Sequence, residues 1–364
     1  MLLLDRKLVE RARNARSTAD VIALLDGAVT LELSTLPPYL TGVFSLKPGS
    51  NDAIRALVMS VVLQEMLHMA IAANTSIAIG GNPAVFKAGL ALRYPGPLPM
   101  SVEESLVVSL QPLTIEQTKD VFMMIERPDT TATLPGEPPA HAQRVMALKK
   151  QGYASIGEFY QAIIDALTRL AATGDPFADP RLDRQLDLAR WFPAGVPGNP
   201  SCKVRDLPTA IAGLETIVRQ GEGAQIGDDP IAPYAGGDSL AHYFKFGEVA
   251  FGHTLTKDAA QPSGWAYAGD AVLYDAGAVY DFPANAKVSD YPAGSAARIT
   301  AETFYESYVR LLRVLDATFN GEPHAFDAAL GVMFELKLIA QQVVQHPADP
   351  KQASGKVAAP PFQP

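Results

Sequence analysis

Two ionisable residues interrupt an apolar helical stripe between residues 51 and 80. The positions that share this face are Ile54, Val58, Val61, Glu65, His68 and Ala72. Glu65 and His68 are three residues apart, so on a helix both side chains point the same way and can reach one ion. A buried carboxylate must be paired, protonated or bound to a cation. The spacing indicates a metal site, although one such pair also arises by chance and can be satisfied within a core.

Three more polar residues continue apolar stripes on other predicted helices. Glu32 falls in the stripe of the first long helix, Glu222 extends that of the third, and His242 opens the inner face of the fourth. Glutamates from two helices and Glu-x-x-His motifs from two others build carboxylate-bridged di-iron or di-manganese centres. Oxygen and imidazole ligands without thiolate suit iron, manganese or zinc, and the helical context favours iron. The predicted metal ligands are Glu32, Glu65, His68, Glu222 and His242.

The second Glu-x-x-His motif is incomplete. Ser239 stands three residues before His242, where the pattern has glutamate, and Glu248 lies about 120° around the helix. The second metal position therefore lacks a carboxylate unless Asp238 reaches it from the helix end. The sequence leaves open whether the chain binds one or two ions.

Two residues near these motifs have a simpler interpretation. Glu126 precedes Arg127 and Pro128, and we expect it to be a structural ion pair or a helix-end group. Tyr39 lies just beyond Pro37-Pro38 and could orient a ligand carboxylate. Core packing with a satisfied hydroxyl is the favoured interpretation for this tyrosine.

Long amphipathic helices must position the ligands. We expect them at about 18–36, 51–80, 207–221 and 239–252, with the first ended by Pro37-Pro38. A proline-rich insertion at 82–200 and turns at 254–296 would shape a pocket, and added helices are expected within 301–344. Together these segments predict a single domain over 1–350 followed by a flexible tail at 351–364.

Composition excludes several classes of protein. The 364 residues are 48% hydrophobic and 19% charged, which indicates a folded chain. A net charge of −9 without a basic stripe argues against a nucleic-acid partner. Charged residues interrupt the most apolar window, so no membrane span is expected. The lone Cys202 excludes an intrachain disulfide framework and favours a reducing, cytoplasmic compartment. No nucleotide-binding motif appears, and a homo-oligomer is compatible with the sequence.

Several segments together resemble the ferritin-like domain of the iminophenyl-pyruvate dimer synthase family, known from bisindole pigment and indolocarbazole biosynthesis. They are Leu31-Glu32-Leu33-Ser34-Thr35-Leu36-Pro37-Pro38-Tyr39, Gln64-Glu65-Met66-Leu67-His68-Met69, Ile217-Val218-Arg219-Gln220-Gly221-Glu222-Gly223 and His242-Tyr243-Phe244-Lys245-Phe246. The likeness extends to Phe122-Met123-Met124-Ile125-Glu126-Arg127-Pro128 and Phe319-Asn320-Gly321-Glu322-Pro323. It covers the chain from about residue 20 to 345.

The resemblance implies a mainly α, ferritin-like four-helix bundle with a non-haem iron site. That family is associated with oxidative coupling of imines derived from aromatic amino acids. We therefore expect an O₂- or peroxide-dependent oxidoreductase that acts on a small organic molecule, with an amino-acid-derived imine as one candidate. The alternatives are a metal-sequestration protein and a ferritin-like scaffold that has lost its metal.

Overall fold

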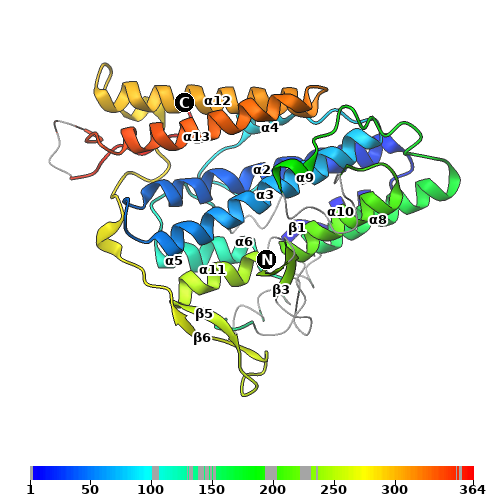
Figure 1. Ribbon diagram of the computed structural model, residues 1–364, viewed down its shortest axis with the longest axis horizontal. Helices are drawn as coiled ribbons and strands as arrows, with labels where there is room; N and C mark the ends of the chain where they lie inside the picture. Colours follow the sequence, from blue (N-terminus) through cyan, green and yellow to red (C-terminus); the bar gives the residue numbers. More distant parts are fainter. Residues whose placement is uncertain are drawn as a thin grey trace.

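The computed structural model describes most of the chain. The described residues are 3–100, 106–128, 130, 134–137, 143, 147, 150, 153–192, 203–221, 231–234, 237–349, 351 and 355–364. The structure is mainly helical, as the sequence predicts, and the short strands are insertions between helices. The helices lie in layers, with one long pair in the middle of the molecule (Figure 1).

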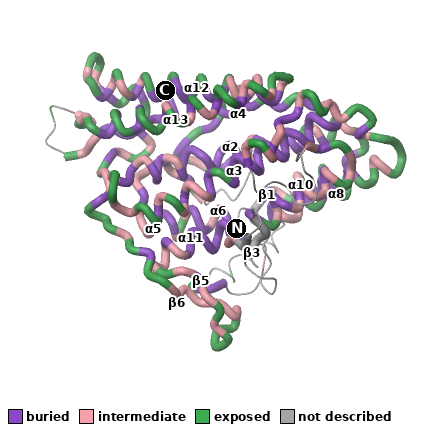
Figure 2. Tube along the Cα trace, in the orientation of Figure 1, coloured by how far each residue is buried: buried purple, intermediate pink, exposed green. Residues whose placement is uncertain are grey.

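The central layer is the pair α2 (Thr18–Ser45) and α3 (Asp52–Ala78). A capping box between Ser17 and Asp20 starts α2, because each side chain bonds the other residue's backbone N–H. Buried residues concentrate along both helices (Figure 2). Within the described residues, α3 is the helix long and apolar enough to cross a membrane, yet 72% of its most apolar window is buried inside the fold. Such burial is typical of a core helix.

The predicted end of the first helix is wrong, because α2 continues through Pro37 and Pro38 to Ser45. A proline inside a helix lacks the N–H that would bond the carbonyl four residues earlier. For Pro38 that carbonyl belongs to Ser34, and the buried Tyr94 hydroxyl donates to it at 2.6 Å. Partners distant in the sequence thus satisfy a group that the proline leaves unpaired, and the helix carries Tyr39 into the core.

A second layer covers one face of this pair. It contains α8 (Ile156–Thr173), α10 (Leu207–Gln220) and α11 (His242–Phe251), together with a short helical segment, Ile115–Ile125. That segment is α5 (Ile115–Gln117), the π-helical turn η1 (Thr118–Phe122) and α6 (Met123–Ile125). α8 contacts α2, α10 contacts α3, and α11 packs on α3, η1 and α6. The expected insertion at 82–200 therefore supplies α8 and the segment Ile115–Ile125 to the bundle.

A third layer covers the opposite face of α2 and α3 (Figure 1). It is formed by α12 (Ala296–Phe319) and α13 (Phe326–Val343), with α4 (Val85–Ala91) packed against α12 and α2. The remaining short helices are α1 (Arg6–Arg13), α9 (Leu188–Trp191), η2 (Ala276–Ala278), η3 (Val288–Asp290) and η4 (Pro323–Ala325).

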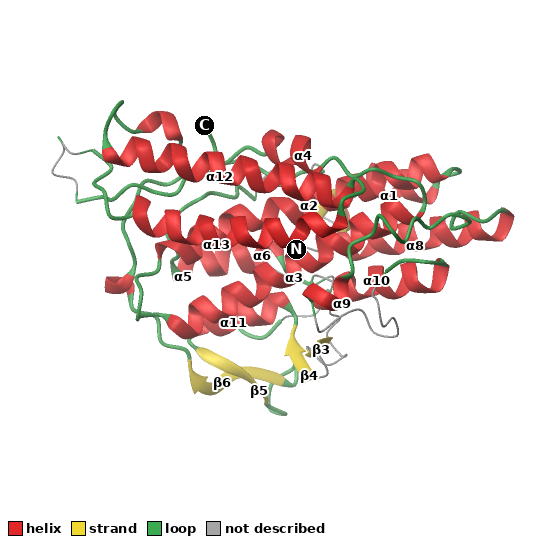
Figure 3. Cartoon of the chain, turned by 45° about the horizontal axis from the view of Figure 1, so that its top comes forward, coloured by secondary structure: helices red, strands yellow, loops and turns green. Residues whose placement is uncertain are grey.

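In the described part of the chain, the strands form three small antiparallel pairs. They are β1 (Leu3–Asp5) with β2 (Tyr153–Ser155), β3 (Ile231–Tyr234) with β4 (Gly237–Leu240), and β5 (His253–Lys257) with β6 (Trp265–Ala271). The β5–β6 hairpin follows directly after α11 (Figure 3). Because β4 runs to Leu240, the fourth predicted helix begins at His242 instead of residue 239.

Within the segment predicted as a flexible tail, the described residues 355–364 contact the rest of the fold. Ala358, Ala359 and Phe362 are buried against the core. Gln363 also donates to the carbonyl of Tyr94 and accepts from its backbone N–H, at 2.7 and 3.1 Å. The polar and proline-rich composition of this segment does not indicate that its apolar residues are buried. Through these residues the segment 355–364 packs as part of the domain.

Candidate metal centre

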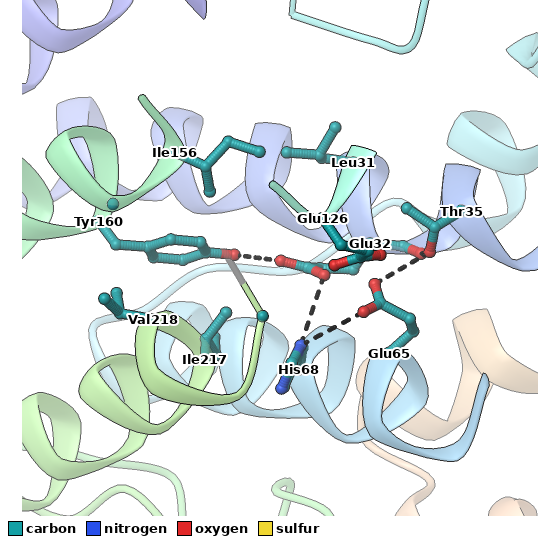
Figure 4. Close-up of a pocket in the computed structure, with 12 residues that line it drawn as sticks. Leu31, Glu32, Thr35, Glu65, His68, Glu126, Ile156, Tyr160, Ile217 and Val218 are labelled. Carbon is teal, nitrogen blue, oxygen red and sulfur yellow. Dashed lines mark hydrogen bonds and ion pairs between the residues drawn. The ribbon is translucent and has the colours of Figure 1, made fainter. Parts of the chain in front are cut away.

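The helix pair brings three predicted ligands together in a buried site. Glu32 comes from α2, while Glu65 and His68 lie one turn apart on α3 and face it (Figure 4). His68 Nδ1 lies 3.7 Å from Glu65 Oε1 and 3.8 Å from Glu32 Oε2. The i, i+3 spacing predicted this convergence, because it places both side chains on the same face of α3.

His242 joins this cluster from the first residue of α11. Its Nδ1 lies 2.8 Å from Glu65 Oε1, and its ring stacks on that of His68 with centroids 5.3 Å apart. One ligand atom each from Glu65, His68 and His242 lies within 4.8 Å of the others. All three residues are buried, which is the arrangement expected of ligands that share an ion or adjacent ions.

Glu126 is a further carboxylate beside the cluster; it lies at the end of α6, as the helix-end interpretation predicts, and it also faces His242. Its Oε2 lies 3.2 Å from His242 Nδ1, and its side chain is buried. The neighbouring Arg127 forms the structural pair instead, with its fully buried guanidinium held by both carboxylate oxygens of Glu137 at 2.5 and 3.0 Å. The sequence signal available was a glutamate directly after the apolar run Phe122–Ile125.

Hydrogen bonds orient the ligand side chains. The Tyr160 hydroxyl donates to Glu32 Oε1 at 2.5 Å, and the Thr35 hydroxyl donates to Glu65 Oε2 at 3.0 Å (Figure 4). The Tyr39 hydroxyl donates to Glu126 Oε1 at 2.5 Å, so this tyrosine does orient a carboxylate of the site. Such outer-shell partners fix ligand geometry in metal sites.

A similar bond sets the tautomer of His68. Its Nε2 lies 3.1 Å from Gln220 Oε1 on α10, and since this oxygen is an acceptor, Nε2 carries the proton. Nδ1 then presents its lone pair to the side where Glu32 and Glu65 lie. A neutral imidazole in this tautomer is ready to bind a metal.

The charges of the cluster favour a bound cation. Burial raises the pKa of Glu32 and of Glu65 well above the usual range, and nearby carboxylates raise both further. Burial also lowers the pKa of His68 well below its usual value, and the charge of His242 adds to that effect. Lys245 donates to Gln64 in the same region, where burial lowers its pKa to about 8. A metal ion would neutralise the carboxylates where protonation otherwise must.

The space between the ligands is small. A cavity of about 20 Å³ is lined by residues that include Glu32, Glu65, His68, Glu126 and Tyr160. This volume admits an ion or a water molecule but no organic substrate. The oxygen and imidazole donors, the cavity and the buried charge together fit a transition-metal centre.

The remaining predicted positions do not complete the set. Glu222 lies outside the described residues. Ser239 belongs to β4 rather than to α11, and its hydroxyl donates to the carbonyl of Leu240 at 3.4 Å. Glu248 faces β5, where its carboxylate accepts from the backbone N–H of Leu255 at 2.9 Å. The carboxylate missing beside His242 comes from Glu126, and the side chain of Asp238 lies outside the described part.

Comparison with known proteins supports the fold. A family model described as Ferritin-like matches residues 25–250. No curated protein sequence matches the chain. Among solved structures, a ferritin-like protein from Caulobacter vibrioides is similar at a TM-score of 0.56 and 20% identity, covering 88% of this chain and 94% of that one.

Proposed function

The chain belongs to the ferritin-like family, and we propose that it is a non-haem iron protein that uses the buried Glu and His cluster as its metal centre. The observation that carries this proposal is the convergence of Glu65, His68 and His242, whose ligand atoms lie within 4.8 Å of one another. Manganese is the alternative metal, because the same donors suit it.

The ligands divide into two adjacent sets that share Glu65. One set is Glu32, Glu65 and His68, and the other is Glu65, Glu126 and His242. A bridging carboxylate with one imidazole on each side is the pattern of two-metal bundle sites. We therefore propose two ion positions, with Glu126 supplying the carboxylate that the Glu-x-x-His pattern would place at position 239, where this chain has serine.

The proposed activity is oxidation of a small organic molecule. When bound, iron would supply redox chemistry with O₂ or peroxide. The protein's own residues hold the ligands in place: Tyr160 and Tyr39 orient carboxylates, and Gln220 orients His68. The likeness of motifs to the iminophenyl-pyruvate dimer synthase family supports an amino-acid-derived imine as the substrate class. The reducing cytoplasm, as proposed from the lone Cys202, would keep iron in its ferrous form.

The size of the central cavity favours a second candidate, metal sequestration without organic chemistry. At about 20 Å³ the space beside the ligands holds no organic substrate in this conformation. To oxidise an organic molecule, the protein would have to change conformation so that the molecule reaches the metal ligands. Otherwise electrons would have to pass from the molecule to the metal over a distance. Sequestration requires neither.

Metal analysis and thermal melting test the proposal. Purified protein should contain iron or manganese, and added Fe(II) under anaerobic conditions should raise the melting temperature over that of chelator-treated protein. Glu65→Gln and His68→Ala should abolish this shift, whereas Glu215→Gln on the exposed face of α10 should preserve it. A melting temperature indifferent to metal and chelator would instead indicate a scaffold that has lost its metal. Fe(II)-dependent O₂ consumption that no aromatic imine or amino acid alters would favour sequestration.

A further inference from the structure

An apolar cavity of about 450 Å³ lies between the central helix pair and the α12–α13 layer. Small-molecule sites in proteins occupy roughly 300 to 1,000 Å³, so this volume is sufficient for an organic ligand. The metal centre lies on the other face of α2 and α3, where the α8, α10 and α11 layer packs (Figure 1). The two cavities are therefore separate.

The same two helices supply both sites with alternating residues. On α3, Glu65 and His68 face the metal centre, whereas Met66 and Met69 line the apolar cavity. On α2, Glu32 faces the metal centre and Leu33 lines the cavity. One layer of helices thus separates the sites, and a ligand in the apolar cavity would not contact the metal ligands directly.

The lining of the cavity is suited to a hydrocarbon chain. It consists mainly of aliphatic, aromatic and thioether side chains, with methionines contributed at Met59, Met66, Met69 and Met333. Methionine side chains adapt to irregular apolar partners. The inner wall is deep, because Met66 and Met69 are only 7% and 1% exposed. A flat face of a second protein could cover the mouth, but it could not fill this depth.

Polar groups gather at one end, near the C-terminus of α2. Arg55 donates to the carbonyls of Val43, Leu46 and Lys47 there, and the Gln345 side chain lies 3.4 Å from the Tyr280 hydroxyl. Lys337 lies midway along the stretch of α13 that lines the cavity, and its side chain is exposed. It forms no ion pair with any described residue. Its ammonium group remains available to an anion at the mouth.

We propose that this cavity binds a fatty acid, with the aliphatic chain inside and the carboxylate at the mouth beside Lys337. Burial of a hydrocarbon chain against apolar walls drives binding, and the exposed ammonium favours an anionic head. The proposal does not depend on the metal centre, since the ligand occupies the opposite face of α2 and α3.

Calorimetric titration of delipidated full-length protein tests the proposal with octanoate, decanoate and dodecanoate, each below its micelle concentration. Each added methylene should strengthen binding about fourfold until the chain fills the cavity. Dodecanol should bind more weakly than dodecanoate. Binding without dependence on chain length, or equal binding of the alcohol, would overturn the proposal, as would no binding at all.

Matched variants locate the site. Ala340→Phe places a ring in the cavity and should weaken dodecanoate binding by about tenfold or more. Leu338→Phe places the same ring on the exposed face of α13 and should change nothing. Lys337→Gln should weaken dodecanoate binding about threefold without affecting dodecanol binding. The control Lys87→Gln on α4 should change neither affinity.

The variants at Lys337 keep the test valid if Ala340→Phe fails to fold, because Lys337 is exposed. Metal content measured on each sample separates this proposal from the previous one: fatty-acid binding should be equal in Glu65→Gln and in the wild type. A concentration-dependent dimer that Phe334→Ser dissociates, in protein that binds no fatty acid, would show that a second copy covers this face and would overturn the proposal.

Discussion

The Tyr39 hydroxyl lies 2.5 Å from Oε1 of Glu126, although 87 positions separate the two residues in the chain. Tyr39 reaches this place because α2 continues past Pro37 and Pro38. The same glutamate faces His242 through its other oxygen at 3.2 Å. The tyrosine on the central helix therefore holds one oxygen of a carboxylate whose other oxygen faces His242.

Loss of this hydroxyl should weaken metal binding without unfolding the protein. We expect Tyr39→Phe to lower the affinity for Fe(II) by about tenfold, as outer-shell substitutions commonly do. Anaerobic titration of Fe(II) measures the effect. Tyr94→Phe is the matched control, because that buried hydroxyl bonds the Ser34 carbonyl away from the metal ligands. It should reduce the free energy of unfolding by about 1 to 2 kcal/mol and leave the metal affinity unchanged.

Removal of the Glu126 charge tests the second ion position. Glu126→Gln should lower the bound metal by about one ion per chain, because its ligand set retains only Glu65 and His242. Glu116→Gln, an exposed position on the same segment, serves as the control. Metal stoichiometry by mass spectrometry decides the matter, and an unchanged stoichiometry in Glu126→Gln would remove this residue from the site.

The bond from His68 to Gln220 makes a separate prediction. Gln220→Leu removes the acceptor that fixes the His68 tautomer, and we expect metal affinity to fall by about tenfold to a hundredfold. On the same helix the Thr216 hydroxyl donates to the carbonyl of Ala212, so Thr216→Val should not alter metal affinity. Equal affinities in the two variants would contradict the orienting role of Gln220.

Asp26 should make stability depend on pH. Burial raises the pKa of this half-buried residue to about 6, and its Oδ1 has no hydrogen-bond partner within the described chain. A raised pKa means that the folded state loses stability as pH rises from the unfolded value of 3.8 through 6. Asp26→Asn should therefore increase the free energy of unfolding by about 1 kcal/mol at pH 7, after allowance for solvent screening, and by less at pH 5.

The control for that measurement has the opposite sign. The pKa of Asp20 is lowered, mainly because its carboxylate accepts the backbone N–H of Arg16 at the start of α2. Asp20→Asn should therefore destabilise the protein at neutral pH. Denaturant unfolding at both pH values measures the two variants, and an Asp26→Asn effect that does not grow with pH would contradict the raised pKa.

Local patterns in the sequence were sufficient to predict the Glu65 and His68 pair. Both residues lie on one helix, and their i, i+3 spacing fixes their relative direction wherever α3 packs. Glu32 and His242 could be predicted for a similar reason. Each falls on the inner face of its helix, and both helices, α2 and α11, pack on α3.

Features that depend on distant partners could not be predicted in this way. The ending of a helix at Pro37-Pro38 is a sound local rule, but here the carbonyl of Ser34, which Pro38 cannot bond, accepts from Tyr94 of another segment. Glu126 turns inward because Arg127 is held by Glu137 and because Tyr39 reaches it. The chain end packs through Ala358, Ala359 and Phe362, and Gln363 bonds the backbone of Tyr94. Each of these depends on a contact between remote residues that no periodicity encodes.

A crystal structure of iron-loaded protein, with anomalous data collected at the iron absorption edge, tests the metal centre most directly. We predict anomalous density among Glu32, Glu65, His68, Glu126 and His242, with Glu65 between two ions at full occupancy. Fully loaded crystals that show no peak there, or that place iron only at surface carboxylates, would contradict the account.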